Sequence, residues 1–301
     1  MNTRTAIITG ATSGLGLECA RALLGSDPSW HIVLPVRDIV RGTAAVEVLG
    51  EPERCTVMPM DLASLTSVRA FTDDVAAEAL PPLQAIACNA GLQVVSGTEW
   101  TEDGVEMTFG VNHLGHFALV HGLLDTLTPP ARIVVVSSGT HDPTKLTGMP
   151  DPRYSSAEDL ARPDKSADPD GRRRYTTSKL CNLLFTYELD RRLGCGRDGV
   201  TVNAFDPGLM PGSGLARDYS PLGRLAWRYL FPALRVLPHV NSTRASGRHL
   251  ASLVNDARFD GVSGQYFEGK RPIKSSADSY DRDKARDLWD TSEALLNHAC
   301  K

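Results

Sequence analysis

The chain has 301 residues, of which 42% are hydrophobic and 23% are charged. These values are ordinary for a globular protein and exclude a disordered or fibrous chain, and the length suits one large domain or two small ones. Lysine and arginine number 32 against 36 aspartate and glutamate residues, and the net charge of −4 at pH 7 indicates no nucleic-acid partner.

The first ten residues, MNTRTAIITG, are too short and too quickly polar for a signal peptide. No run approaches the roughly 18 apolar residues that a membrane-spanning helix needs. We therefore expect a soluble, cytoplasmic protein without a transmembrane segment. The six cysteines show no CxxC pair and no Cys/His spacing typical of zinc, so we expect free thiols and no metal site.

Short apolar runs alternate with longer segments of helical character along most of the chain. Strands are predicted at residues 5–9, 31–36, 55–60, 85–88, 132–138, 200–205 and 264–269. Helices are predicted at residues 14–25, 38–49, 64–80, 101–126, 174–194 and 241–255. The strand candidates are apolar without strict alternation, as in parallel strands covered on both faces. This pattern predicts an α/β fold with a doubly wound, seven-stranded parallel sheet in a single domain, 1–301, although Pro35 fits poorly inside its strand.

Two segments depart from this pattern. Residues 139–173 are polar and rich in Pro, Asp and Gly, and a connection of this length is usually functional or mobile. Residues 209–240 contain apolar residues at helical spacing with arginines on the opposite face. That second segment is either an ordinary amphipathic helix packed on the domain or a substrate lid, with contact to a membrane surface as a third alternative.

The first predicted strand runs directly into the sequence TGATSGLG, residues 9–16. Its glycines, Gly10, Gly14 and Gly16, stand at a strand-to-helix turn, where backbone can approach a pyrophosphate and the helix N-terminus favours negative charge. The alternative is a glycine-rich turn without a ligand. Its position after the first strand favours a dinucleotide site.

Tyr175 and Lys179 stand one helical turn apart in the sequence YTTSK. A free phenol has a pKa near 10, and an ammonium group beside it stabilises the phenolate and lowers that pKa. Such a phenol serves as a general acid when a carbonyl is reduced and as a general base when an alcohol is oxidised. The alternative is an incidental pair on a surface helix.

Several motifs occur in the order found in one known family. They are TGATSGLG at 9–16, DL at 61–62, CNAG at 88–91, VNHLGHF at 111–117, VVVSS at 134–138, YTTSK at 175–179 and DPG at 206–208. On these motifs the chain resembles the short-chain dehydrogenase/reductase family over essentially its whole length, with Cys88 in place of the first Asn of the family's NNAG. The resemblance implies a Rossmann-type fold.

The resemblance also implies roles for individual residues. The catalytic residues would be Ser138, Tyr175, Lys179 and Asn112, with Ser137 as the alternative to Ser138. Ser138 would bind the substrate oxygen, and Asn112 would hold a helix kink and a water near Lys179. The cofactor-binding residues would be Gly10, Thr12, Ser13, Gly14, Leu15, Gly16, Arg37, Asp61, Leu62, Asn89, Ala90, Gly91, Tyr175, Lys179, Pro207 and Gly208.

Charge at the end of the second strand indicates which cofactor is used. An NAD site usually places a carboxylate there for the ribose 2′-hydroxyl, whereas this chain has Val36 followed by Arg37. A guanidinium suits a 2′-phosphate, so we expect NADP (NADPH) as the cofactor. The alternative is that Arg37 pairs with Asp38 or points into solvent.

Other polar residues near these motifs are expected to have structural roles. We expect His113 and His116 to be packed, hydrogen-bonded side chains, and we regard His141 as a weaker catalytic candidate than Tyr175. The arginines 172–174 are expected to form a solvated loop end, and Cys181 is expected to pack on the inward face of its helix.

The long segment 139–173 and the sequence SKLCNLLF resemble the branch that holds protochlorophyllide reductases and retinol dehydrogenases. Light-dependent protochlorophyllide enzymes carry a Cys where this chain has Leu209. We therefore expect an NADPH-dependent carbonyl reductase or alcohol dehydrogenase that acts on a bulky apolar small molecule, such as a polyketide ketone or a retinoid. The alternatives are a protochlorophyllide reductase-like double-bond reductase and a non-catalytic dinucleotide-binding regulator. The resemblance also allows a homo-oligomer.

Overall fold

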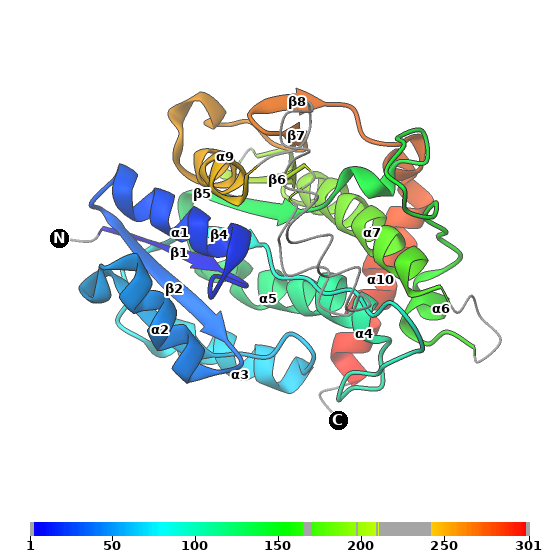
Figure 1. The fold of residues 1–301 in the computed structure, drawn as a ribbon, viewed down its shortest axis with the longest axis horizontal. Helices are drawn as coiled ribbons and strands as arrows, with labels where there is room; N and C mark the ends of the chain where they lie inside the picture. The colour runs from blue at the N-terminus through cyan, green and yellow to red at the C-terminus, as the bar shows by residue number, and fades with distance from the viewer. Residues whose placement is uncertain (1–2, 165–169, 197, 209, 211–241, 299–301) are drawn as a thin grey trace.

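The strands form one mainly parallel sheet in the order β3-β2-β1-β4-β5-β6-β7-β8 (Figure 1). The computed structural model describes residues 3–164, 170–196, 198–208, 210 and 242–298. The strands are β1 (Arg4–Ile8), β2 (Trp30–Val36), β3 (Cys55–Pro59), β4 (Leu83–Cys88), β5 (Leu127–Val136), β6 (Val200–Asp206), β7 (Tyr266–Glu268) and β8 (Arg271–Ile273). The order reverses between β1 and β4, and such a reversal opens a crevice at the carboxyl ends of the strands.

The predicted α/β fold is confirmed, but the number of strands differs from the prediction. The seven expected strands are present and parallel, and β8 adds an eighth that pairs antiparallel with β7. β8 has only three residues, of which two are exposed and one is Pro272. It therefore lacks the apolar run that marked the other strands in the sequence.

Pro35 lies inside β2 without losing a sheet hydrogen bond. Met60 N donates to Val36 O at 2.9 Å, so Val36 faces β3. Because successive residues of a strand point their backbone groups to alternate sides, Pro35 faces β1. The last register pair between β1 and β2 is Ile7 with Val33, so Pro35 lies beyond the part of β2 that pairs with β1. The missing N–H of the proline therefore costs no ladder bond.

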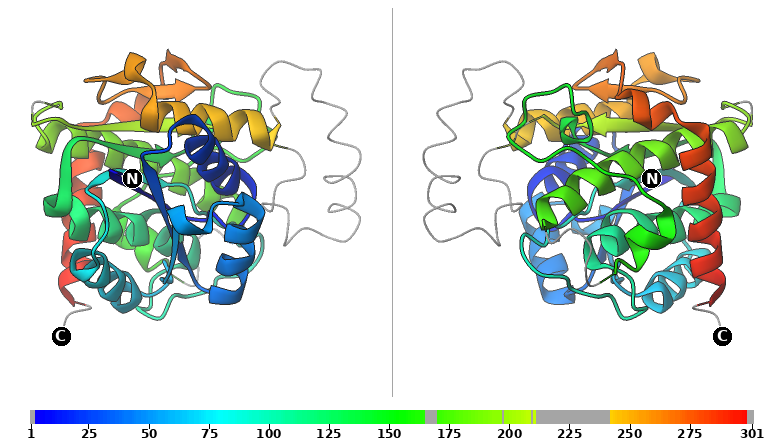
Figure 2. Two further views of the ribbon diagram at one scale, coloured as in Figure 1. Left: turned by 90° about the vertical axis from the view of Figure 1, so that its left-hand side faces the viewer. Right: turned by 90° about the vertical axis from the view of Figure 1, so that its right-hand side faces the viewer.

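Helices cover both faces of the sheet. They are α1 (Gly14–Ser26), α2 (Ile39–Leu49), α3 (Leu65–Ala77), α4 (Met107–Phe109), a π-helical turn (Gly110–Leu114), α5 (Gly115–Leu123), α6 (Ala157–Ala161), α7 (Gly171–Arg192), α9 (Thr243–Asn255) and α10 (Arg282–His298). In Figure 2, α9 (gold) lies beside α1 (blue), with which it packs closely. On the other face α10 runs along α7. The adjacent residues Ile7 and Ile8 are both fully buried, one in each of the two cores.

The helices differ from the sequence-based expectation in several places. The helix predicted over 101–126 begins only at Met107, because Trp100 and Glu106 first form an isolated antiparallel bridge. α10 was not predicted as a helix, although Leu288, Ser292 and Leu295 of this helix are buried at helical spacing. The segment 209–240, apart from Met210, lies outside the described residues.

The segment 139–173 is anchored on α7 and α10. Tyr154 Oη and the amide of Ala157 donate to Asp287 Oδ2 at 2.7 Å and 2.8 Å. Arg153 N donates to Thr177 Oγ1 at 2.9 Å. The described part of the segment is therefore tied to the helix that carries Tyr175.

The start of α7 packs directly on the chain that follows β4. A Cβ added at Gly171 would lie 1.7 Å from Val94 O, a separation that no real contact allows. We therefore expect Gly171→Ala to force the two segments apart and to lower the free energy of unfolding by about 1–3 kcal/mol. The measurement is the midpoint of urea unfolding.

Gly25→Ala is the matched control, because a Cβ added at Gly25 in α1 meets nothing within 4 Å. A helical Gly-to-Ala change there should leave stability unchanged or raise it by up to about 1 kcal/mol. A Gly171→Ala protein as stable as the unaltered protein would contradict the close packing.

Candidate active site

The glycine-rich turn presents unblocked backbone at the N-terminus of α1. Ser13 is the N-cap residue, yet its side chain makes no capping hydrogen bond, and the first turn carries no acidic residue. Gly14 has a φ of +60°, and a Cβ added there meets nothing within 4 Å. A Cβ at Gly16 would lie 2.6 Å from Gly10 O. The turn thus combines open N–H groups with a positive helix end, a combination that fits a pyrophosphate.

The Thr9 hydroxyl joins the ends of β1 and β4 beside this turn. Thr9 Oγ1 accepts hydrogen bonds from Asn89 N at 2.8 Å and from Ala90 N at 2.9 Å. Asn89 Nδ2 in turn donates to Thr9 O at 2.7 Å. The predicted cofactor residues Asn89 and Ala90 are therefore held at the point where the strand order reverses.

His116 extends this network to Asn112. His116 Nδ1 lies 3.2 Å from Asn112 O, and because a carbonyl only accepts, Nδ1 carries the proton. His116 Nε2 then accepts from the Thr9 hydroxyl, 2.9 Å away. Burial lowers the pKa of His116 to about 4, and the charge of Lys179 acts in the same direction. His116 is neutral at pH 7 and packed, as predicted.

His113 and His141 are also buried and hydrogen-bonded. His113 Nε2 lies 2.9 Å from Ser292 Oγ of α10, and burial lowers the pKa of His113 to about 3. His141 Nδ1 donates to Ser138 O at 2.6 Å, and His141 Nε2 accepts from Ser276 N at 3.1 Å. These contacts agree with the predicted packing of His113 and assign His141 to the support of the loop after β5.

Tyr175 and Lys179 lie on one buried stretch of α7. Lys179 Nζ lies 5.5 Å from the centroid of the Tyr175 ring and donates to Val136 O at 3.3 Å. Burial lowers the pKa of Lys179 to about 8, while the carboxylate of Asp206 opposes that shift. Lys179 therefore carries its proton at pH 7. The structure brings the two residues together as the sequence pattern predicted.

Asn112 connects the chain after β4 to α7. It lies in the π-helical turn, where Asn112 Nδ2 donates to Leu92 O and to Ser178 Oγ, each at 2.9 Å. Asn112 Oδ1 accepts from Leu92 N at 2.8 Å. A Cβ added at Gly91 would lie 3.3 Å from Asn112 Oδ1 and 3.6 Å from Lys179 Nζ. Asn112 is thus placed near Lys179.

The two serines after β5 differ in their contacts. Ser137 is buried, and its Oγ donates to Lys179 O at 2.7 Å, which ties β5 to α7. Ser138 is half-buried, and among the described residues its Oγ accepts only a long bond of 3.3 Å from Thr140 N. Of the two, Ser138 is the better placed to meet a substrate.

The remaining predicted cofactor residues also follow strand ends. Asp61 and Leu62 come after β3, where Asp61 Oδ1 accepts from Ala63 N at 3.0 Å. Gly208 N donates to Asp206 Oδ1 at 2.9 Å, which closes the turn that contains Pro207 after β6. Thr12 and Leu15 belong to the turn described above.

Arg37 is exposed at the end of β2. Asp38 serves instead as the N-cap of α2 and accepts from Arg41 N at 3.2 Å. Within the described ranges, no ion pair joins Arg37 to Asp38. The alternative use of Arg37 as the partner of Asp38 therefore receives no support.

The arginines 172–174 belong to the start of α7 and not to a loop end, although Arg172 is exposed as expected. The helix begins at Gly171, since Asp170 caps it by accepting from Arg172 N at 3.0 Å. Arg174 Nε lies 3.1 Å from Oε1 of Glu106, which is 1% exposed and whose pKa is raised by burial. Cys181 is buried as predicted, and burial raises the pKa of its thiol.

Residues that the sequence analysis did not select also shape the site. They are Thr9, Leu92, Glu106 and Asp206. Asp206 is the first residue of the DPG motif at 206–208, and its place in this motif could have identified it. Thr9 is the first residue of the glycine-rich motif, whereas Leu92 and Glu106 act through contacts between distant segments and left no signal in the sequence.

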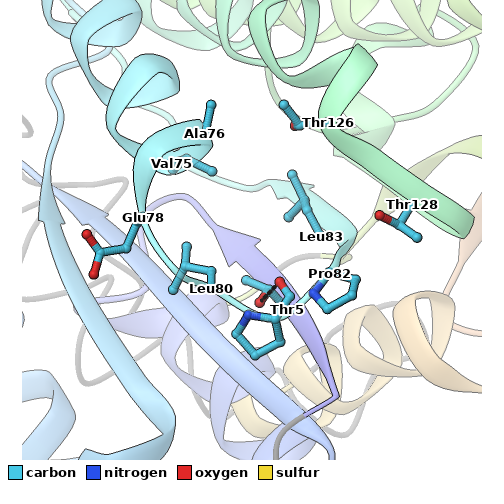
Figure 3. A pocket seen from close by; sticks show the side chains of 10 residues that line it. Thr5, Val75, Ala76, Glu78, Leu80, Pro82, Leu83, Thr126 and Thr128 are labelled. Carbon is cyan, nitrogen blue, oxygen red and sulfur yellow. Dashed lines mark hydrogen bonds between the residues drawn. The ribbon is translucent and has the colours of Figure 1, made fainter.

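A hollow of about 190 Å³ opens at the opposite edge of the sheet, between the amino ends of β1, β4 and β5 (Figure 3). It is lined by Thr5, Val75, Ala76, Glu78, Leu80, Pro81, Pro82, Leu83, Thr126 and Thr128. It contains a single ionisable side chain and lies away from Tyr175. It is therefore not the candidate active site.

Comparison with known proteins identifies the family. The sequence profile described as short chain dehydrogenase matches residues 4–151. Protochlorophyllide reductase A of Oryza sativa is 36% identical over 96% of this chain and 80% of its own length. Protochlorophyllide reductase of Avena sativa is 35% identical over 97% of this chain and 99% of its own. The chain belongs to the short-chain dehydrogenase family. Within this family of oxidoreductases, it belongs to the branch that contains the protochlorophyllide reductases.

Solved structures agree with this assignment. An uncharacterized protein from Mycobacterium paratuberculosis is 29% identical with a TM-score of 0.71, over 98% of this chain and 94% of that one. A blue fluorescent protein from a metagenomic library, solved in complex with NADPH, is 23% identical with a TM-score of 0.63, over 89% and 96% of the two chains. The second likeness supports the fold alone.

Among the described helices of this short-chain dehydrogenase, none is both long and apolar enough to span a membrane. The described residues also contain no group of three His, Cys, Asp or Glu side chains arranged to bind a metal ion. The rice relative is named as chloroplastic. The cytoplasmic location and the homo-oligomer stay predictions for this chain.

The buried histidines should make the stability of the protein depend on pH. His113 and His116 are neutral in the folded protein and gain a proton on unfolding below a pKa of about 6.5, so their contribution to stability is present above pH 6.5 and falls as the pH falls toward 4. We expect protonation of His113 on unfolding to lower the free energy of unfolding by about 2 kcal/mol at pH 5, and we expect the same of His116. The measurement is the unfolding free energy between pH 7.5 and pH 5.

His116→Gln should reduce this loss, while His121→Gln, a change at an exposed position of α5, should leave it as it is. An equal pH slope in the unaltered protein and in the His116→Gln variant would contradict the neutral, buried state of His116.

Proposed function

We propose that the chain is an NADPH-dependent oxidoreductase, a carbonyl reductase or alcohol dehydrogenase, that transfers hydride between the nicotinamide and the carbonyl of a bulky apolar substrate. The observation that carries this proposal is the position of Tyr175, Lys179, Ser138 and Asn112 around the carboxyl ends of β4, β5 and β6. The open glycine-rich turn lies at the neighbouring strand end. A proton-transfer group and a dinucleotide site on the same edge of the sheet suit hydride transfer.

The bound nicotinamide would supply or accept the hydride. The Lys179 ammonium lies near the Tyr175 ring and stabilises the phenolate that remains after Tyr175 gives its proton to the substrate oxygen. Ser138 would donate a hydrogen bond to the same oxygen and would orient the carbonyl. Asn112 holds Leu92 and Ser178 in place and so fixes the distance between the chain after β4 and α7.

Burial makes this proton relay effective. Lys179 is 3% exposed, so its charge acts on Tyr175 through a poorly polarisable medium and with little screening by salt. The same burial brings the pKa of Lys179 to about 8, close to the working pH. We propose that the relay works best below that value, where Lys179 keeps its proton.

The residues at the ends of β1, β2 and β6 support NADPH as the cofactor. The pyrophosphate would lie on the N-terminus of α1, with Asp61 and Leu62 near the adenine. Arg37 is exposed at the end of β2, where the 2′-phosphate would lie, and Arg41 stands one helical turn further on an exposed position of α2. Pro207 and Gly208 would meet the nicotinamide side.

A bulky apolar substrate is supported by the sequence of residues 209–240, which contains seven Leu, two Tyr and one Trp. A polyketide ketone or a retinoid fits that composition. We also propose that the segments 139–173 and 209–240 frame the substrate within a single domain, 1–301.

Reduction of a carbon–carbon double bond, as in protochlorophyllide reductase, is the second candidate. It is favoured by the identity of 36% to the rice enzyme over most of the chain. Leu209 stands where light-dependent enzymes carry a Cys, and this difference favours carbonyl reduction. A non-catalytic dinucleotide-binding regulator is the third reading, which the Tyr175–Lys179 pair disfavours.

One experiment separates these functions. NADPH consumption is measured with apolar ketones of graded size in the dark, and with protochlorophyllide in the dark and in light. We expect dark turnover of a bulky ketone, and Tyr175→Phe should lower the turnover number at least 100-fold because the proton donor is lost.

Cofactor binding by Tyr175→Phe, followed by NADPH fluorescence, should stay within a few-fold of the unaltered protein. Turnover in light alone would favour the second candidate, and binding without any turnover would favour the regulator. Undiminished ketone reduction by Tyr175→Phe would refute the role of Tyr175.

Arg37 should decide the preference between NADPH and NADH. Arg37→Asp replaces a partner of the 2′-phosphate with a repelling charge, so we expect kcat/KM for NADPH to fall at least tenfold, since a charge-assisted hydrogen bond contributes about 1.5–3 kcal/mol. The value for NADH should change little. Steady-state kinetics with both cofactors provide the measurement.

Arg286→Asp is the control, because it makes the same charge change at an exposed position of α10. Equal efficiencies with NADH and NADPH in the unaltered enzyme would count against an NADP site.

A further inference from the structure

Asp206 is a buried carboxylate at the last position of β6, and both of its oxygens are held. The residue is 4% exposed. Oδ1 accepts from Gly208 N at 2.9 Å, and Oδ2 accepts from the Tyr266 hydroxyl at 2.9 Å. Because both oxygens accept hydrogen bonds, the carboxylate has a defined orientation.

Asp206 lies at the level of the proposed catalytic residues. Ser137 N donates to Phe205 O at 2.8 Å, so Asp206 is aligned with the two serines that follow β5. A Cβ added at Gly139 would lie 3.1 Å from Asp206 Oδ2. The carboxylate therefore borders the backbone directly after Ser138.

Lys179 is fully enclosed, and an enclosed ammonium is costly unless an anion lies nearby. Within the described chain, the only hydrogen bond of Lys179 Nζ goes to the neutral carbonyl of Val136. Val136 pairs in register with Phe205, the residue directly before Asp206, so the carboxylate lies beside the strand end that Lys179 contacts. Burial lowers the pKa of Lys179, and the charge of Asp206 opposes that shift. Asp206 therefore supplies the negative charge that the neutral carbonyl of Val136 does not provide.

We propose that Asp206 is a positioning residue, whose carboxylate serves as the counter-charge of Lys179 and at the same time holds the turn of Pro207 and Gly208. This inference rests on the proposed function, because it assigns Asp206 to the proton relay of that site. Asp206 acts through Lys179 and Gly208 and needs no contact with the substrate.

The other titratable groups around this pair define its environment. Asp206 is faced by Lys145 at 4.0 Å, by His141 and by the Tyr266 hydroxyl. Lys179 is faced by Tyr175 of its own helix and by His116 of α5. His116 and His141 both have lowered pKa values because of burial, and the hydroxyl of Tyr266 has a raised one. Lys145 is therefore the second charge that acts on Asp206.

The sign of the effect of Asp206 follows from charge alone. A nearby anion opposes the loss of a proton from any group, so it raises the apparent pKa values of the coupled Tyr175–Lys179 pair. Removing the anion lowers them. The pH at which carbonyl reduction declines on the alkaline side should therefore fall.

Asp206→Asn tests this directly, because asparagine keeps the shape of the side chain. Its Oδ1 can accept from Gly208 N and its Nδ2 can donate to the Tyr266 oxygen, while the charge is lost. We expect the alkaline limb of the kcat profile to move down by about one pH unit. The KM for NADPH should change less than threefold.

Asp206→Ala removes the hydrogen bond to Gly208 as well as the charge. It should show the same shift of the alkaline limb and, in addition, a KM for NADPH raised at least fivefold. Lys145→Met removes a half-exposed cation from the other side of Asp206 and should move the limb in the opposite direction, to higher pH. Because Lys145 is half-exposed, this variant also tests the charge effect if the Asp206 variants do not fold.

A measurement without cofactor or substrate completes the test. The side-chain NMR titration of Lys179, assigned by its absence in Lys179→Arg, should give a lower pKa in Asp206→Asn than in the unaltered protein. An unchanged Lys179 titration together with an unmoved limb in Asp206→Asn and Lys145→Met would overturn the inference. If ketone reduction still required Tyr175 in that case, the proposed function would stand without the role of Asp206. If no ketone were turned over but the Lys179 titration shifted in Asp206→Asn, the proposed function would be refuted and Asp206 would still be the counter-charge of Lys179.

Discussion

The hydrogen bonds of Thr9 hold the two halves of the sheet together at the point where the candidate site lies. Its hydroxyl accepts from the two amides that follow β4 and donates to His116, which in turn donates to the carbonyl of Asn112. Asn112 then reaches Ser178 of α7. A continuous set of buried, fully oriented hydrogen bonds thus connects the glycine-rich turn to the helix of Tyr175. Because buried polar groups are costly when unpaired, each member fixes the position of the next.

The candidate site also contains a charge that burial disfavours. Lys179 keeps its proton at pH 7 although nearly all of its surface is removed from water, and the pKa of about 8 reflects that cost. The enclosed position strengthens the effect of the ammonium on Tyr175, and the buried carboxylate of Asp206 offsets part of the cost. The burial that strengthens the effect of Lys179 on Tyr175 therefore also lowers the stability of the fold at the ends of β5 and β6.

Most of the fold could be predicted because parallel strands covered on both faces are rich in apolar residues, and seven of the strands carry enough of them to be recognised. β8 escaped prediction because it is short and exposed. The start of α7 was placed too late, since Asp170 caps the helix from a polar segment that resembles a loop. Arg174 was taken as solvated because its partner Glu106 is distant in the sequence and comes close only in the folded chain.

The sequence by itself determined the family through its ordered motifs, the positions of seven strands through their apolar residues, and the spacing of Tyr175 and Lys179 through the helix period. Only the tertiary structure shows how the two serines differ: the hydroxyl of Ser137 donates to the backbone of α7, whereas Ser138 is half-exposed. Only the fold, likewise, brought Asp206 close enough to act on Lys179. These choices depend on contacts between residues far apart in the chain, and no local pattern records them.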